Sequence, residues 1–221
     1  MKTILMASAL LACSLAGYAQ ADQQLANSLK KDQPNKKDLK KNGSGILFAQ
    51  VGPQMSWPGG DGGNYSGGAL GIGGGVEGSL LQLNKRMLLQ GGLLFSQQGG
   101  KTMTYSYNPG VSYGEVETTR RLNYLAMPVT ALYQTRPRQG FFAEAGLQPA
   151  LLLSAKEEGR DLKDEYKPFD LGLVAGVGYQ FGRHIRTQLR VVPGLLNIRK
   201  ESTYNLSERN LVASLRVGYV F

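Results

Sequence analysis

The chain ends on the stretch LVASLRVGYVF, residues 211–221, in which apolar residues alternate with small or polar ones. A period of two places Leu211, Leu215, Val217, Tyr219 and the terminal Phe221 on one face of a strand, opposite Ser214, Arg216 and Gly218. Seven more segments of strand character precede this one, and the gaps between them alternate between long and short. Such a layout is typical of a closed β-barrel that crosses a membrane, with long loops on one side and tight turns on the other.

The predicted strands are long enough to cross a bilayer. We expect them at residues 46–56, 67–81, 87–98, 120–134, 140–153, 168–181, 185–198 and 211–221. A tilted transmembrane strand needs about 9–11 residues, whereas strands of soluble proteins average about 5–6. No apolar run reaches the ~20 residues of a transmembrane helix. The 30 glycines and 11 tyrosines also suit many strands better than a helical bundle.

Alternation alone leaves open which face of the barrel points outward. A soluble calycin-like barrel that binds a ligand would enclose the apolar face, and this stays an alternative. Strand length, loop asymmetry and aromatic residues near strand ends favour a membrane barrel; these aromatics are Phe95, Tyr133, Tyr179, Phe181, Tyr219 and Phe221. We therefore predict an all-β fold, an eight-stranded antiparallel transmembrane β-barrel integral to the cell outer membrane, with both ends of the domain in the periplasm.

The N-terminal residues predict export. Residues 1–21 combine a basic start, a short apolar run and small residues before Ala19 and Ala21, as in a cleaved signal peptide. Cys13, the only cysteine, is then removed with the signal or, alternatively, lipidated in the manner of a lipoprotein. Residues 22–45 contain six lysines and no aromatic residue to stack on bases. We expect a disordered basic periplasmic tether, with an anionic surface as an alternative contact and no nucleic-acid partner, followed by the barrel domain at 46–221.

Few motifs suggest chemistry. Gly73, Gly75 and Gly78 match a dinucleotide-binding pattern, but no helix follows them. In a narrow barrel, such glycines make room for large side chains of neighbouring strands. The glycine-rich loop 59–64 has one carboxylate, too few for calcium, and the single histidine, His184, lies in a short turn. We expect no enzyme activity, no cofactor and no metal site, with a carboxylate-based barrel enzyme as an alternative.

Charged residues gather on the predicted inward face: Glu77, Glu144, Asp170, Arg186, Arg190 and Arg216. The interior of an eight-stranded barrel is only just wide enough for side chains, and a buried charge requires a partner. We therefore predict an ion-pair network that fills the lumen. A small anion-selective pore with these residues at its constriction is the alternative.

Two further segments predict partners. Leu215, Val217, Tyr219 and Phe221 have the character of the C-terminal signal that barrel-insertion machinery reads, so this machinery and outer-membrane lipid are expected partners. The longest loop, residues 99–119, carries Tyr105, Tyr107 and Tyr113, and exposed aromatics often anchor partners. We expect a scaffold or interaction protein whose extracellular loops contact a protein not yet identified. Alternatively, these tyrosines extend the strands or rest on the barrel rim.

Three stretches resemble one known family: NYLAMPVTALY at 123–133, LFSQQGG at 94–100 and GVGYQF at 176–181. They are similar to PorT-like outer-membrane β-barrel proteins of Gram-negative bacteria, over residues 46 to 221. The resemblance implies barrel construction more than activity, and the family name implies a link to secretion or envelope integrity. Ala126 stands where the family often has glutamate, so an inward acid is absent there. Pro128 interrupts a paired strand, and we expect a bulge at this position.

Overall fold

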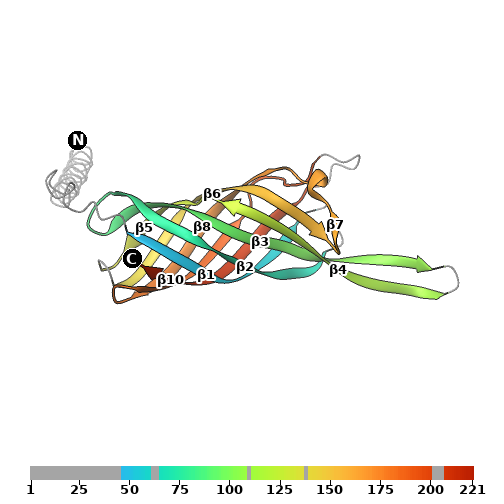
Figure 1. The fold of residues 1–221 in the computed structure, drawn as a ribbon, viewed down its shortest axis with the longest axis horizontal. Coiled ribbons are helices and arrows are strands. Elements are labelled where there is room, and N and C mark those ends of the chain that lie inside the picture. The colour runs from blue at the N-terminus through green and yellow to red at the C-terminus, as the bar shows by residue number, and fades with distance from the viewer. Residues whose placement is uncertain (1–45, 61–64, 109–110, 137–138, 201–206) are drawn as a thin grey trace, which may run out of the picture. The chain divides into compact units, whose positions relative to one another are not determined.

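The structure is a computed structural model that describes residues 46–60, 65–108, 111–136, 139–200 and 207–221 (Figure 1). The predictions made for the signal peptide, for Cys13 and for the tether at 22–45 lie outside these residues. The elements are β1 (Leu47–Gly59), β2 (Tyr65–Gln82), β3 (Met87–Asn108), β4 (Val111–Ala126), β5 (Val129–Gln134), β6 (Gly140–Glu157), β7 (Arg160–Asp161), the 3-10 helix η1 (Lys163–Glu165), β8 (Phe169–Phe181), β9 (Ile185–Pro193) and β10 (Arg209–Val220). In the described part of the chain, no helix is long and apolar enough to span a membrane.

The strands form a closed antiparallel ring. Neighbours pair in the order β2, β1, β10, β9, β8, β6 and β4, while β3 pairs with both β4 and β2 and so closes the sheet. β5 continues the line of β4 between the same two neighbours, β3 and β6. β7 is a two-residue strand that pairs only with β6. Counting β4 and β5 as one, eight strands of the described residues surround the lumen, which confirms the predicted fold class.

Apolar side chains cover the outside of the ring and polar ones line much of the inside. Leu70 of β2 is 75% exposed, Val177 of β8 is 57% exposed and Leu215 of β10 is 54% exposed. Polar residues on the opposite face are buried, among them Glu77 of β2 and Arg216 of β10. A water-soluble barrel would place these residues the other way round. The soluble calycin-like alternative is therefore wrong.

Aromatic rings form a band on the outside at the end of the ring where the turns are short. Phe141 packs edge-on against Tyr179, at 4.8 Å between centroids, and Tyr179 packs against Phe181 at 4.7 Å. Tyr219 contacts Phe221 at 5.2 Å between centroids. Such a band matches the aromatic girdle of an outer-membrane barrel at the membrane–water interface.

Two local predictions need correction. The strand does break at Pro128, since β4 ends at Ala126 and β5 begins at Val129, but the pairing with β3 and β6 keeps its register across the gap. There is therefore no bulge at the proline; the register shift between β4 and β6 falls between Asn123 and Tyr124. Residues 99–119 are not a loop either. β3 runs on to Asn108 and β4 starts at Val111, so most of the segment is a β-hairpin.

Candidate functional site

A salt-bridged cluster crosses the lumen toward the short-turn end. Arg190 of β9 donates from Nε to Glu144 Oε1 on β6 at 2.6 Å and from Nη2 to Glu77 Oε1 on β2 at 2.9 Å. Gln50 donates to Glu77 at 2.6 Å, and Gln188 donates to Glu144. The side chains of Arg190 and both glutamates are at most 1% exposed. The Arg190 guanidinium therefore links three strands of the ring, β9, β6 and β2.

Two more arginines belong to this region, which we name the central cluster: Glu77, Glu144, Arg186, Arg190 and Arg216. Arg186 lies over the rings of Phe48 and Phe142, with Cζ 4.5 and 3.8 Å from their centroids, a cation–π arrangement. Arg216 is 2% exposed, and its Nε and Nη1 have no hydrogen-bond partner among the described residues. Three arginines therefore face two glutamates, which makes the cluster net cationic.

Asp170, the sixth residue of the predicted network, lies elsewhere. It is 5% exposed at the start of β8, and Leu171 N donates a hydrogen bond to its Oδ1 at 2.7 Å. Among the described residues it forms no ion pair with the arginines of the central cluster. The expectation that all six charges would pair with one another thus does not hold for Asp170.

Glycines give the large lumen side chains their space. A Cβ on Gly178 would lie 2.2 Å from Phe142 Cζ, and one on Gly176 would lie 2.6 Å from Glu144 Oε1. A Cβ on Gly73 would lie 2.3 Å from Gln54 Oε1. The glycine pattern that imitates a dinucleotide-binding motif therefore lies in a strand whose glycines accommodate neighbouring side chains.

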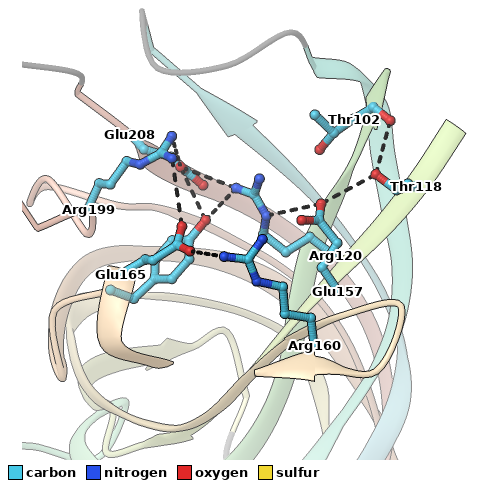
Figure 2. A network of polar contacts seen from close by, with 9 residues as sticks. Thr102, Thr118, Arg120, Glu157, Arg160, Glu165, Arg199 and Glu208 are labelled. Carbon is cyan, nitrogen blue, oxygen red and sulfur yellow. Dashed lines mark hydrogen bonds and ion pairs between the residues drawn. The ribbon is translucent and has the colours of Figure 1, made fainter. Parts of the chain in front are cut away.

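A second polar network lies at the long-loop end, as Figure 2 shows. We name it the rim network; its members are Arg120, Glu157, Arg160, Glu165, Tyr166, Arg199 and Glu208. Glu208 is 1% exposed and lies 3.5 Å from Arg120 Nη1 and 3.9 Å from Arg199 Nη1. Glu165 Oε1 lies 3.6 Å from Arg160 Nη2, and Glu165 Oε2 lies 3.9 Å from Arg199 Nη2.

Tyr166 connects the segment between β6 and β8 to the barrel through hydrogen bonds of its hydroxyl. Its hydroxyl accepts a hydrogen bond from Arg120 of β4 and donates one to Glu208 Oε2 at 3.4 Å. Burial, and next the nearby Glu208 carboxylate, raise the pKa of the Tyr166 phenol above its ordinary value of 10.0. The phenol therefore stays protonated and keeps its donor role at neutral pH.

An apolar layer lies below the rim network. It contains Leu94, Leu122, Tyr124, Ala126, Ala150, Leu152, Ala155, Leu162, Tyr166 and Ile198. Leu162, Tyr166 and Ile198 come from loop segments, and each is at most 3% exposed. Loops from two places in the chain therefore fold inward and cover the mouth of the lumen. Ala126 is fully buried on the inner face, where a glutamate would have placed a charge in this apolar layer.

Sequence reasoning missed the rim network. None of its members was among the predicted site residues, although Glu157 lies 3.6 Å from Arg120 with its side chain only 24% exposed. The alternation could have identified two members: the inward residues of β4 and β10 have even numbers, and Arg120 and Glu208 continue this alternation. Tyr166 and Arg199 carry no such signal, because they lie outside the long strands.

The remaining predicted residues lie at the two ends of the barrel. Leu215, Val217, Tyr219 and Phe221 face outward and are 54%, 52%, 49% and 71% exposed. His184 stacks on Tyr219, with 5.3 Å between ring centroids, at the short-turn end. The backbone places Tyr105 and Tyr107 in β3 and Tyr113 in β4; their side chains lie outside the described part of the structure.

The β3–β4 hairpin continues beyond the ring (Figure 1). Pairing of β2 with β3 ends at Tyr65 and Thr102, and pairing of β4 with β6 ends at Arg120 and Glu157. Beyond these positions the two strands pair with each other, from Met103 with Glu117 to Asn108 with Val111. Among the described residues, the outer edges of this ribbon have no strand neighbour.

Solved structures of similar fold are outer-membrane proteins. Neisserial surface protein A is 16% identical over 79% of this chain and 97% of its own, with a TM-score of 0.51. Ail of Yersinia pestis is 13% identical over 80% of this chain and 99% of its own, with a TM-score of 0.43. OprG of Pseudomonas aeruginosa is 9% identical over 80% and 96%, with a TM-score of 0.45.

No curated protein matches this sequence. Residues 41–200 match the family described as outer membrane protein beta-barrel domain. This match agrees with the closed ring, its apolar outside and its aromatic band, and it confirms the predicted outer-membrane location. The chain belongs to the outer membrane protein beta-barrel domain family.

Proposed function

We propose that the protein is a non-enzymatic interaction protein of the outer membrane that presents the β3–β4 hairpin to a protein partner. The observation that carries this proposal is the ribbon beyond Thr102 and Arg120, which has two strands and free outer edges. Unpaired backbone N–H and C=O groups at a strand edge can pair with a strand of another chain. The closed ring holds the base of the ribbon rigidly, as a scaffold holds a binding loop.

A closed lumen supports this function over conduction. The central cluster and the apolar layer fill the interior, and the cavity bordered by Gln98, Gln148, Asp170 and Asn210 measures about 10 Å³. That volume holds about one water molecule. We expect planar-bilayer recordings of the purified protein to show no steady high-conductance steps. Such steps with anion selectivity would favour the small pore instead, since the central cluster is net cationic.

The finer family placement is part of the proposal. The stretches at 94–100, 123–133 and 176–181 support a PorT-like protein, with a role in secretion or envelope integrity. We do not favour an enzymatic role. The single histidine, His184, lies in a turn at the short-turn end, and the acids of the rim network are engaged by arginines.

Crosslinking in intact cells tests the proposed contact. Photo-reactive residues introduced at Met103 and Glu117, on either strand of the ribbon, should yield the same protein adduct, identified by mass spectrometry. Shortening the hairpin by removal of residues 104–116 should abolish the adduct while the barrel still assembles. The matched control removes residues 201–206, which precede β10 in the sequence, and should leave the adduct unchanged.

Two outcomes would contradict the proposal. If the shortened hairpin keeps every adduct and phenotype of the intact protein, the hairpin is not the contact. If removal of residues 201–206 abolishes the adduct as well, the partner recognises the whole outer face rather than a strand edge.

A further inference from the structure

A small polar cavity in the lumen is separate from both charged networks. Its lining includes four polar side chains, Gln98, Gln148, Asp170 and Asn210, each 3–5% exposed. The rest of the lining is glycine, alanine and valine, which offer no side-chain hydrogen bond. The volume of about 10 Å³ limits the occupant to one water-sized particle.

The polar lining is rich in acceptors. Gln148 Oε1 and Asn210 Oδ1 are buried and have no hydrogen-bond partner among the described residues. The Asp170 carboxylate has one backbone hydrogen bond, from Leu171 N. A buried oxygen without a donor costs roughly 1–3 kcal/mol, and an unpaired buried carboxylate costs several. Three such groups at one cavity point to a positively charged occupant.

The hydrogen bonds of Asn210 leave its side-chain oxygen without a donor. Asn210 Nδ2 donates to Gln98 Oε1 at 2.9 Å, and Gln98 Nε2 donates to Ser96 Oγ at 3.2 Å. Gln54 Nε2 donates to Ser96 Oγ at 3.0 Å and to the backbone oxygen of Gln97 at 2.6 Å. In this arrangement Asn210 Oδ1 is a buried acceptor with no partner among the described residues.

A water molecule satisfies this lining poorly. Water donates only two hydrogens and needs two to four partners in all, whereas the residues that line the cavity carry the Asp170 carboxylate and two unpartnered amide oxygens, those of Gln148 and Asn210. All of these oxygens can coordinate one cation at the same time, and one positive charge balances the one carboxylate. Calcium would require six to eight oxygens and usually several carboxylates, so the single acid indicates a monovalent ion.

We propose that this cavity binds one small monovalent cation, with the Asp170 carboxylate as its charge-balancing ligand and the amide oxygens of Gln148 and Asn210 as neutral ligands. No local metal-binding motif marks this site in the sequence, because its acid and its two amides come from three different strands, β8, β6 and β10. The site is independent of the proposed partner contact, which lies in the β3–β4 hairpin.

Urea unfolding of the full protein in phospholipid vesicles tests the site. NaCl is exchanged for N-methylglucamine chloride at constant ionic strength, so that only the small cation changes. In the wild type, each tenfold rise in Na⁺ above half-saturation should lower the unfolding equilibrium constant up to about tenfold. Asp170→Asn, which keeps the shape and removes the charge, should abolish this dependence. Glu117→Gln, which removes an exposed acid on β4, should keep it.

A second variant and a spectroscopic measurement complete the test. Gln148→Met removes one neutral oxygen at similar volume and should shift half-saturation to higher Na⁺. In Na⁺-free buffer, the infrared band of a protonated carboxyl should appear in the wild type, vanish at saturating Na⁺, and be missing from Asp170→Asn. A wild type insensitive to Na⁺, an Asp170→Asn variant that responds like the wild type, or a carboxyl band that persists in Na⁺ would overturn the proposal.

Discussion

The central cluster and the rim network use the same residue types but differ in burial and in support. In the centre, Arg190 approaches Glu144 at 2.6 Å and Glu77 at 2.9 Å, and all three side chains are at most 1% exposed. In the rim network, the nitrogen–oxygen distances of the ion pairs range from 3.5 to 3.9 Å, and the side chain of Arg160 is 77% exposed. Rigid strands position the first set, while loops position most of the second. Burial and support, rather than charge, decide how much each contact stabilises the fold.

The largest effect is expected for Glu144→Gln in the central cluster. The change leaves Arg190 with one carboxylate in a site shielded from water, and breaking a buried ion pair costs about 3–5 kcal/mol. Urea unfolding in vesicles should show this loss of unfolding free energy. The double change Glu144→Gln with Arg190→Met should cost less than the single change, because it removes one charge of each sign and leaves the net charge of the central cluster as it is in the wild type. A single variant within 1 kcal/mol of wild type would show that water reaches Arg190.

The same contrast explains what could be predicted from sequence. Glu77, Glu144 and Arg190 were identifiable because inward residues of a long strand recur every second position, and a lumen charge needs a partner. The alternation predicts which side chains face the lumen, but not how far along the barrel axis each one lies. It therefore could not show that Asp170 lies away from the arginines. Tyr166 and Arg199 lie beyond the strand ends, where no period constrains them.

The β3–β4 hairpin was predicted as a loop for a similar reason. Its residues are polar enough to resemble a loop, although threonine, tyrosine and valine at Thr102, Tyr105, Tyr113 and Val116 favour strands. The strands were predicted by their fit to the thickness of a bilayer, which a strand of about 9–11 residues crosses. β3 has 22 residues and is therefore longer than this fit requires. Nothing in the alternation marks where the membrane ends and the hairpin continues into water.

A smaller effect is expected for Glu208→Gln at the rim. Glu208 lies near Arg120 and Arg199 and accepts a hydrogen bond from Tyr166, and hydrogen bonds to charged groups contribute about 1.5–3 kcal/mol. We expect a loss toward the lower end of that range, because both arginines are partly exposed. Faster proteolysis of the loop at 158–168 should accompany it. Glu158→Gln, an exposed acid in the same loop, is the control and should change neither quantity.

The Tyr166 phenol makes the rim sensitive to high pH. Its pKa is raised in the folded protein, so the unfolded chain loses this proton first, near the ordinary value of 10.0. The contribution of Tyr166 is complete below that pH, and above it stability falls by up to about 1.4 kcal/mol per pH unit. Tyr166→Phe should remove this part of the alkaline slope. Parallel slopes for both proteins between pH 10 and 11 would contradict the buried, protonated phenol.

The smallest effect is expected for an ion pair whose distance equals the shortest in the central cluster. Lys101 Nζ lies 2.6 Å from Glu117 Oε1, as Arg190 Nε lies from Glu144 Oε1, but both side chains of the first pair are 45% exposed. Water and salt screen an exposed pair, whose contribution is about 0.2–1 kcal/mol. Glu117→Gln should therefore cost less than 1 kcal/mol in the urea measurement, and 1 M salt should remove even that. The cost of Glu144→Gln should persist at the same salt concentration, because salt screens a buried pair much less than an exposed one. Equal costs at the two positions would mean that distance, and not burial, governs ion-pair strength in this barrel.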